Sequence, residues 1–172
     1  MKLYNKDQDI KSLRKAIFLD RDGEINKERG DYTYLLENFE ILPDVIESLE
    51  LFQKKNYLLI IMSNQGGIAK NVYTKADVEI LHSFLLMKLR ESSIHITEIY
   101  YCPHHPLKGK CLCRKPDSLL IEKSIARFNI DCGLSYFIGD KERDILAGQQ
   151  AGVKSILIKP NESLLNIMEF ID

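Results

Sequence analysis

The sequence predicts an α/β fold in which a doubly wound parallel sheet is covered by helices on both faces. The first observation behind this is that short apolar segments alternate along the chain with longer segments whose apolar residues recur at helical spacing. The second is Ala16–Leu19, a continuous apolar run typical of strands buried on both faces of a parallel sheet. Because parallel strands need crossover connections, this alternation predicts one sheet with helices on its two faces.

Strands and helices are expected in strict alternation, without repeats, low-complexity tracts or an evident linker. The expected strands are Ala16–Leu19, Tyr57–Met62, Ile96–Tyr101, Leu134–Ile138 and Val153–Ile158. The expected helices are one that opens at Pro43, then Thr74–Ser92, Asp117–Asn129 and Asp144–Gln150, and a final amphipathic helix, Ser163–Ile171.

Local signals support several of these helices. Proline is favoured in the first turn of a helix, which suits Pro43. Thr74 with Asp77 three residues later predicts a capping box, and Gly152 is expected to end the short fourth helix. In the second helix, apolar residues at helical spacing are predicted to face the core, namely Leu81, Leu85 and Leu89.

Composition limits the class of protein. The 172 residues suffice for one domain with a hydrophobic core, and 24 basic against 25 acidic residues give a net charge of −1. This balance argues against a nucleic-acid or membrane-surface partner. No apolar run is long enough to span a membrane, and residues 1–14 are too polar for a signal-peptide core. We therefore expect a cytoplasmic protein whose four cysteines are metal ligands or free thiols.

Polar residues follow three of the expected strands. Asp20 and Asp22 end the first strand and Ser63 ends the second. Ligands of open parallel sheets bind at the carboxyl ends of the strands, so these side chains should share one crevice. Two acids at i and i+2 can divide covalent catalysis between a nucleophile and a proton shuttle. Acid-rich turns after strands are common, however, and the pair alone would favour a simple solvated turn.

The other strand ends favour phosphoryl chemistry instead. The Ser63 hydroxyl and nearby amides can hold phosphoryl oxygens, which Lys115 can neutralise. Asp140, after the fourth strand, can join Asp20 in holding a hard cation such as Mg²⁺.

Four motifs resemble, in order, those of the haloacid dehalogenase-like phosphatases. They are Asp20–Gly23, Ser63–Asn64, Arg114–Pro116 and Gly139–Lys141. The cysteine-rich segment makes the chain similar to one branch in particular, the D-glycero-D-manno-heptose 1,7-bisphosphate phosphatases and the related histidinol-phosphate phosphatases. This resemblance covers about residues 15–158 and implies a Rossmann-like, haloacid dehalogenase-like fold.

The resemblance also implies a role for each residue of the motifs. Asp20 would attack phosphorus and carry an aspartyl-phosphate, and Asp22 would protonate the leaving group and then activate water. Ser63 and Lys115 would hold the transferring phosphoryl group. Mg²⁺ would be held by Asp20, the main-chain carbonyl of Asp22 and Asp140, with Asp144 supporting it. The rest of the substrate would be contacted by Asn64, Arg114 and Lys141.

The loop of residues 102–113 carries a candidate zinc site. Its ligands would be two pairs at i, i+2, namely Cys102 with His104 and Cys111 with Cys113. A closed set of three cysteines and one histidine is a structural site, and the alternative is free thiols beside a coincidental histidine. Cys132 is expected to be a free thiol. His82, His95 and His105 are interpreted as helix-surface, turn or loop residues.

The expected function is a Mg²⁺-dependent phosphomonoesterase formed by a single domain, residues 1–172, with its zinc loop and no separate cap domain. We expect a small sugar phosphate, most specifically the heptose bisphosphate cleaved at its 7-phosphate. Basic residues in addition to Lys115 would favour an anionic substrate; the candidates are Lys70, Lys108, Lys110, Arg114 and Lys141. Histidinol phosphate is the alternative, with Glu24 or Asp31 offsetting its ammonium, and a catalytically idle zinc-containing binding protein is another. The sequence does not determine the oligomeric state.

Overall fold

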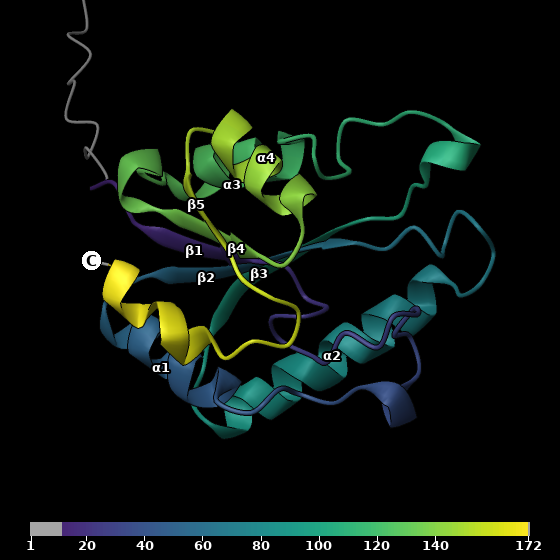
Figure 1. Cartoon of the computed structure of the whole chain (residues 1–172), viewed down its shortest axis with the longest axis horizontal. Coiled ribbons are helices and arrows are strands. Elements are labelled where there is room, and N and C mark those ends of the chain that lie inside the picture. Colours follow the sequence, from purple (N-terminus) through teal and green to yellow (C-terminus); the bar gives the residue numbers. More distant parts are fainter. Residues whose placement is uncertain (1–11, 172) are drawn as a thin grey trace, which may run out of the picture.

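The computed structural model describes residues 12–171 and is built around a five-stranded sheet (Figure 1). All neighbouring strands are parallel, in the order β3-β2-β1-β4-β5. The strands are β1 (Ala16–Leu19), β2 (Leu58–Asn64), β3 (Ile96–Cys102), β4 (Tyr136–Gly139) and β5 (Lys154–Leu157). The predicted doubly wound α/β fold is confirmed.

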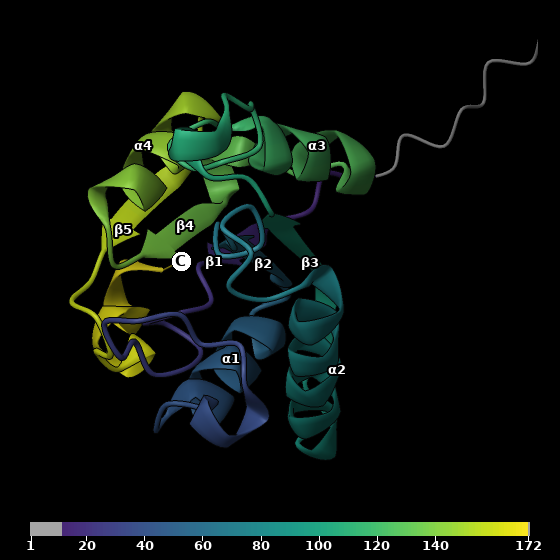
Figure 2. The same ribbon diagram turned by 90° about the vertical axis from the view of Figure 1, so that its right-hand side faces the viewer.

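Two helices cover each face of the sheet (Figure 2). On one face lie α1 (Val45–Lys54) and α2 (Lys75–Glu91), and on the other lie α3 (Leu119–Phe128) and α4 (Glu142–Gln150). The chain runs outward from β1 to β3 and then crosses back to β4 beside β1, so the strand order reverses at β1. Such a reversal opens a crevice at the carboxyl ends of the strands. Over residues 12–171, no helix has the length and apolarity needed to cross a membrane.

The core consists of two apolar layers separated by the sheet. Successive residues of β1 alternate between them, so that Ile17 and Leu19 face the layer beneath α1 and α2, whereas Ala16 and Phe18 face α3 and α4. Both layers bury their side chains almost completely, which explains the continuous apolar character of β1. The predicted core positions of α2 are confirmed as fully buried: Leu81, Leu85 and Leu89.

The predicted capping box of α2 is also present. The Asp77 backbone N–H donates to Thr74 Oγ1 at 3.2 Å, and the Thr74 N–H donates to Asp77 Oδ2 at 2.7 Å. These two bonds satisfy donors that the first helical turn leaves unpaired. The helix therefore starts where the sequence predicted.

Some expected boundaries were wrong. The final segment is a 3₁₀ helix, η4 (Leu164–Phe170), rather than an α-helix, and its buried Leu164 and Ile167 lie three residues apart. The fourth helix begins at Glu142 instead of Asp144, because the Asp144 side chain accepts from the Lys141 N–H as an N-terminal cap. β4 begins at Tyr136 rather than Leu134, which ends the short 3₁₀ helix η3 (Cys132–Leu134).

The connections that would carry a cap domain are short. Between β1 and α1 there is an irregular flap, residues 20–44, which contains one 3₁₀ turn, η1 (Leu36–Asn38). Between β3 and α3 lies a loop with another, η2 (Pro106–Lys108). Neither connection, within the part of the chain that the structure describes, contains a second folded unit, and Figure 2 shows both at the carboxyl-end edge of the sheet.

Packing in the layer beneath α2 can be tested with a matched pair on that helix. Leu85 is fully buried, and Leu85→Ala should lower the free energy of unfolding by about 2–5 kcal/mol through lost burial and a residual cavity. Ile80 is 55% exposed, and Ile80→Ala should cost less than about 1 kcal/mol. Urea denaturation followed by circular dichroism measures both, and equal losses would contradict the assignment of the buried face.

Candidate active site

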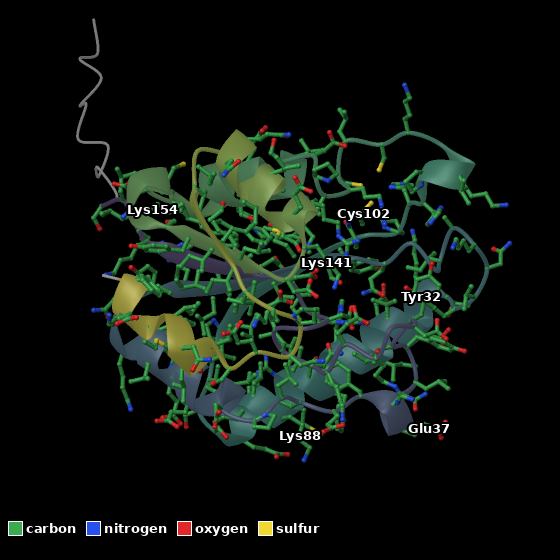
Figure 3. All side chains as sticks on the ribbon, in the orientation of Figure 1. Tyr32, Glu37, Lys88, Cys102, Lys141 and Lys154 are labelled. Carbon is green, nitrogen blue, oxygen red and sulfur yellow. The ribbon has the colours of Figure 1, made fainter. Side chains whose placement is uncertain are left out.

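The candidate site lies at the carboxyl ends of the strands. Figure 3 shows Tyr32, Cys102 and Lys141 around this end of the molecule, whereas Lys154 lies at the opposite end. A cleft of about 570 Å³ opens there, a size typical of small-ligand sites. It is lined by residues from the strand ends, the flap and the loop after β3, including Asp20, Asp22, Ser63, Asn64, His105, Arg114, Lys141 and Arg143.

Asp20 and Lys115 form a buried ion pair at the floor of the cleft. Lys115 Nζ lies 3.0 Å from Asp20 Oδ2 and donates to the Met62 carbonyl at 2.7 Å. Burial raises the pKa of Asp20 to about 6 although Lys115 opposes the shift. Burial would lower the pKa of Lys115, but Asp20 and Asp144 outweigh it and raise that pKa. The lysine is therefore a fixed positive charge beside the Asp20 carboxylate.

Asp144 joins this ion pair and is not part of the carboxylate cluster of Asp20, Glu24 and Asp140. Its Oδ1 lies 2.7 Å from Lys115 Nζ, while its Oδ2 accepts from the Lys141 N–H at 3.1 Å. Gly139 makes room for it, because a Cβ at that position would lie 2.3 Å from Asp144 Cβ. One carboxylate thus both caps α4 and holds Lys115 in place.

Asp22 is held by three side chains. Both of its carboxylate oxygens accept from Arg21, at 2.9 and 3.0 Å, and Asn26 Nδ2 donates to Oδ1 at 2.9 Å. Gln65 Nε2 lies 3.3 Å from Oδ2. Arg21 is itself almost completely buried and donates to the Thr33 carbonyl of the flap at 2.8 Å. Sequence reasoning assigned no role to Arg21, Asn26 or Gln65, because their contacts with Asp22 form only in the folded chain.

A chain of hydrogen bonds connects Ser63 to Tyr73. Gln65 Nε2 donates to Ser63 Oγ at 2.7 Å, and the Tyr73 hydroxyl donates to Gln65 Oε1 at 2.7 Å. The Tyr73 ring packs directly on Gly67, where an added Cβ would lie 2.1 Å from the ring. Gly67 is therefore needed for this packing, which orients Gln65 toward both Ser63 and Asp22.

Asp140 and Glu24 complete the acidic side of the site. Ligand oxygens from Asp20, Glu24 and Asp140 all lie within 4.8 Å of one another. Burial, followed by the charges of Asp20 and Asp140, raises the pKa of Glu24 well above its ordinary value. Gly23 has φ +106° and lies against the Asp140 carboxylate, where a Cβ would come within 2.9 Å of an oxygen. Glu24, which the sequence offered with Asp31 as an acid that could offset a substrate ammonium, is fully buried and does not line the cleft.

The predicted substrate-binding residues differ in what they contact. The Asn64 amide exchanges two hydrogen bonds with the main chain of Lys115, at 3.0 and 3.1 Å. Lys141 contacts Asp140 through its ammonium group. Arg114 donates to the His104 carbonyl at 3.1 Å, and Gly66 leaves room for both Arg114 and His105. Arg143, which sequence reasoning missed, also lines the cleft, and its buried Nε has no hydrogen-bond partner.

Several other predicted residues lie away from the cleft or differ from expectation. Lys70, Lys108 and Lys110 are exposed and do not line it. His105 does line the cleft, although the sequence analysis gave it no role there.

His82 was expected on a helix surface but is buried, with Nε2 at 3.3 Å from Arg21 Nη1. Burial and the Arg21 charge lower the pKa of His82 to about 3, so it is a neutral hydrogen-bond acceptor for the arginine.

The four predicted zinc ligands come together at the end of β3. Cys113 Sγ lies 3.1 Å from Cys102 Sγ and 3.2 Å from His104 Nδ1, and Cys111 Sγ lies 3.7 Å from Cys102 Sγ. Ligands of tetrahedral zinc, bound at about 2.0–2.3 Å, are separated by roughly 3.3–3.8 Å. Of these three separations, only that of Cys111 and Cys102 lies in that range, and the two shorter ones would have to widen by a few tenths of an ångström or more around an ion. All four ligand atoms lie within 4.8 Å of one another, so the cluster is a candidate for a closed zinc site. Cys132 is a free thiol outside the cluster, as predicted.

Comparisons with known proteins agree with this architecture. Residues 112–164 match the family model described as HAD-hydrolase-like. D-glycero-beta-D-manno-heptose-1,7-bisphosphate 7-phosphatase of Haemophilus ducreyi is 36% identical over 158 residues, covering 88% of this chain and 86% of its own. The corresponding alpha enzyme of Campylobacter jejuni is 39% identical over 148 residues, covering 86% and 84%. The chain therefore belongs to the haloacid dehalogenase-like (HAD-like) hydrolases and is a phosphatase.

Solved structures point to the same branch of that family. D,D-heptose 1,7-bisphosphate phosphatase of B. bronchiseptica, complexed with magnesium and phosphate, matches with a TM-score of 0.80 at 26% identity and covers 88% of this chain and 86% of its own. A putative HAD-like phosphatase of Mesorhizobium loti matches with a TM-score of 0.79 at 25% identity, covering 87% and 77%. Within the HAD-like phosphatases, this chain is thus similar to the heptose bisphosphate 7-phosphatases in both sequence and fold.

Removing one ligand of the cysteine cluster tests whether it holds zinc. Cys111→Ser should lower the zinc content of the purified protein from about one ion per chain to well below it, because a serine hydroxyl is a poor zinc ligand. Elemental analysis measures the content, and Cys132→Ser, which removes a thiol outside the cluster, is the matched control. Wild-type protein purified without chelator and found free of zinc would contradict the site.

Proposed function

We propose that the chain hydrolyses D-glycero-D-manno-heptose 1,7-bisphosphate at its 7-phosphate, through an aspartyl-phosphate on Asp20. The observation that carries this proposal is the convergence of Asp20, Asp22 and Ser63 on one cleft, with Lys115 paired to Asp20, in a chain whose relatives are named for that reaction. Some of those relatives are named for the alpha anomer of the heptose bisphosphate and others for the beta anomer, so the proposal does not specify the anomer.

In the first half-reaction, the Asp20 carboxylate attacks phosphorus and the bond to the sugar oxygen breaks. Asp22 gives its proton to the departing oxygen, which becomes the hydroxyl of the product. The Lys115 ammonium, 3.0 Å from Asp20, and the Ser63 hydroxyl are positioned to stabilise negative charge on the phosphoryl oxygens. Arg21 and Asn26 keep Asp22 from turning away from the cleft.

In the second half-reaction, water attacks the phosphorus of the aspartyl-phosphate. Asp22, now ionised, takes a proton from that water, and the bond from phosphorus to the Asp20 oxygen breaks. Inorganic phosphate leaves, and both carboxyl groups return to their starting states. The same residue thus serves as acid and then as base, which requires it to reach both the leaving oxygen and the incoming water.

Two metals fit the proposal. Mg²⁺ would be held by Asp20, the main-chain carbonyl of Asp22 and Asp140. The Asp140 Oδ1 atom supports this, because it is buried without a hydrogen-bond partner and a buried carboxylate oxygen is stabilised by a cation. When bound, Mg²⁺ reduces the repulsion between an anionic nucleophile and an anionic phosphate. Zinc on the cysteine cluster would be structural, ordering the segment that carries Arg114 and Lys115.

The second phosphate of the substrate would be held by the basic rim of the cleft. Arg114 and Arg143 line the rim together with His105, and the guanidinium group suits phosphate oxygens. Asn64, engaged with the Lys115 main chain, would position that lysine rather than contact the sugar. A bisphosphate matches such a rim better than histidinol phosphate, whose ammonium group these charges would repel, although Glu28 and Asp31 also line the cleft.

We further infer that the chain acts as a single phosphatase domain, with residues 102–113 as its zinc loop, and works in the cytoplasm. One continuous sheet with a core layer on each face supports the first point. Four cysteines free of disulfides support the second, because thiols persist in reducing compartments.

The nucleophile can be tested directly. Asp20→Asn keeps the size of the side chain but removes its charge and nucleophilicity, so we expect phosphate release to fall at least about a thousandfold while the circular dichroism spectrum is unchanged. Asp117→Asn, an exposed acid two residues after Lys115, is the control. Substantial turnover by highly purified Asp20→Asn would rule out Asp20 as the nucleophile.

Substrate choice is tested by kcat/KM in the presence of Mg²⁺. The panel comprises both anomers of the heptose bisphosphate, heptose 7-phosphate and histidinol phosphate. We expect a bisphosphate to lead by at least about tenfold, because one guanidinium–phosphate contact contributes roughly 1.5–3 kcal/mol. Arg114→Ala should narrow that lead by lowering kcat/KM for the bisphosphates more than for the monophosphates. A higher kcat/KM for histidinol phosphate would contradict the proposed substrate but not the phosphatase mechanism. If no ester is hydrolysed, the chain is better explained as a catalytically idle binding protein.

A further inference from the structure

The flap buries a carboxylate that has no protein partner. Glu24 is 0% exposed, and neither of its two carboxylate oxygens has a hydrogen-bond partner. An isolated buried carboxylate is strongly disfavoured unless a cation or a proton compensates it. The catalytic steps described above do not use Glu24, so its burial at this position calls for a different explanation.

The surroundings of Glu24 are acidic rather than basic. One oxygen of Glu24 lies within 4.8 Å of oxygens from both Asp20 and Asp140, and the Asp140 Oδ1 is likewise buried without a partner. Oxygens gathered this closely are within reach of a single hard cation, which prefers several carboxylate ligands. The cluster therefore combines the ligand type with the spacing that a divalent cation requires.

The nearby cations are already engaged elsewhere. Lys115 lies between Asp20 and Asp144, and Lys141 contacts Asp140. Arg21 is directed at Asp22 and the flap carbonyl of Thr33. None of these ion pairs, among residues 12–171, includes Glu24. Because the described residues give Glu24 no ion-pair partner, either a bound cation or a proton must compensate its charge.

We infer that Glu24 is a third carboxylate ligand of the divalent cation in this phosphatase, together with Asp20 and Asp140. This inference rests on the proposed Mg²⁺-dependent function and adds to it a ligand outside the four motifs. The flap then has a second role, since folding it over the sheet edge delivers a charged ligand to the cation. The site carries one more negative charge than two aspartates alone would supply, which should raise its affinity for Mg²⁺ and Mn²⁺.

The alternative is that Glu24 is protonated and fills space as a neutral group. Glutamine mimics that neutral acid in shape, so Glu24→Gln separates the two explanations. A space-filling role predicts unchanged cation affinity, whereas a ligand role predicts weaker binding. Glu28→Gln is the matched control, because it removes the same charge at the rim of the same cleft but lies outside the carboxylate cluster.

The experiment measures Mn²⁺ binding to the substrate-free enzyme by electron paramagnetic resonance of the free ion, with Mg²⁺ titration calorimetry in parallel. We expect Glu24→Gln to raise the Kd for Mn²⁺ at least about tenfold, and Glu28→Gln to change it by less than about twofold. In EDTA, Glu24→Gln should unfold at the same temperature as wild type or higher, because it removes an unpaired buried charge. Added Mg²⁺ should raise the unfolding temperature of wild type more than that of the variant.

A second measurement does not depend on the variant folding. Anomalous scattering from wild-type crystals soaked in Mn²⁺ should place the ion about 2.2 Å from a Glu24 oxygen. A Mn²⁺ ion on Asp20 and Asp140 but more than about 3.5 Å from Glu24, or an unchanged Kd in a folded Glu24→Gln, would overturn the inference.

Wild-type phosphate release with and without Mg²⁺ is measured alongside. If release requires Mg²⁺ and Glu24 is not a ligand, only this inference fails; if no Mg²⁺-dependent release occurs, the proposed function fails.

Discussion

The buried ammonium group of Lys115 is the interaction on which the rest of the site depends. It contacts Asp20 at the end of β1, the carbonyl of Met62 in β2 and Asp144 in the first turn of α4. Removing one member of such a buried ionic cluster typically costs about 3–5 kcal/mol, because the remaining charges are left uncompensated. The Lys115 ammonium group therefore holds the end of β1, the end of β2 and the start of α4 together. It also places a positive charge beside the candidate nucleophile, Asp20.

The same lysine connects this edge to the cysteine cluster. Lys115 follows Arg114, whose guanidinium donates to the carbonyl of His104, itself one of the four clustered ligands. The loop after β3 therefore has two anchors, one in the core of the site and one at its own cluster. Because Arg114 and His105 both line the cleft, the loop that positions Lys115 also forms the wall against which a substrate would rest.

Charge pairing organises the remaining acids. Asp22 is held by Arg21, Asp140 contacts Lys141, and the buried His82 remains neutral while accepting from Arg21. Groups fixed in this way stabilise charge in a transition state without reorganising at the moment of reaction. The flap contributes to this arrangement through the Thr33 carbonyl, which accepts from Arg21, so the irregular segment after β1 is part of the site rather than a passive connection.

The sequence by itself determined the fold class and the motif residues, because continuous apolar strands, helical periodicity and acids after strands are local patterns. The paired spacing of Cys102 with His104 and of Cys111 with Cys113 likewise identified the cluster. Only the tertiary structure decided which partner each polar side chain has: Asp144 contacts Lys115, Asn64 bonds the Lys115 main chain, and Glu24 lies close to Asp20 and Asp140. These contacts join residues up to 116 positions apart, as between Glu24 and Asp140, and no local pattern records such a distance. Burial and pairing are properties of the packed chain, so they emerge only when the strand ends meet.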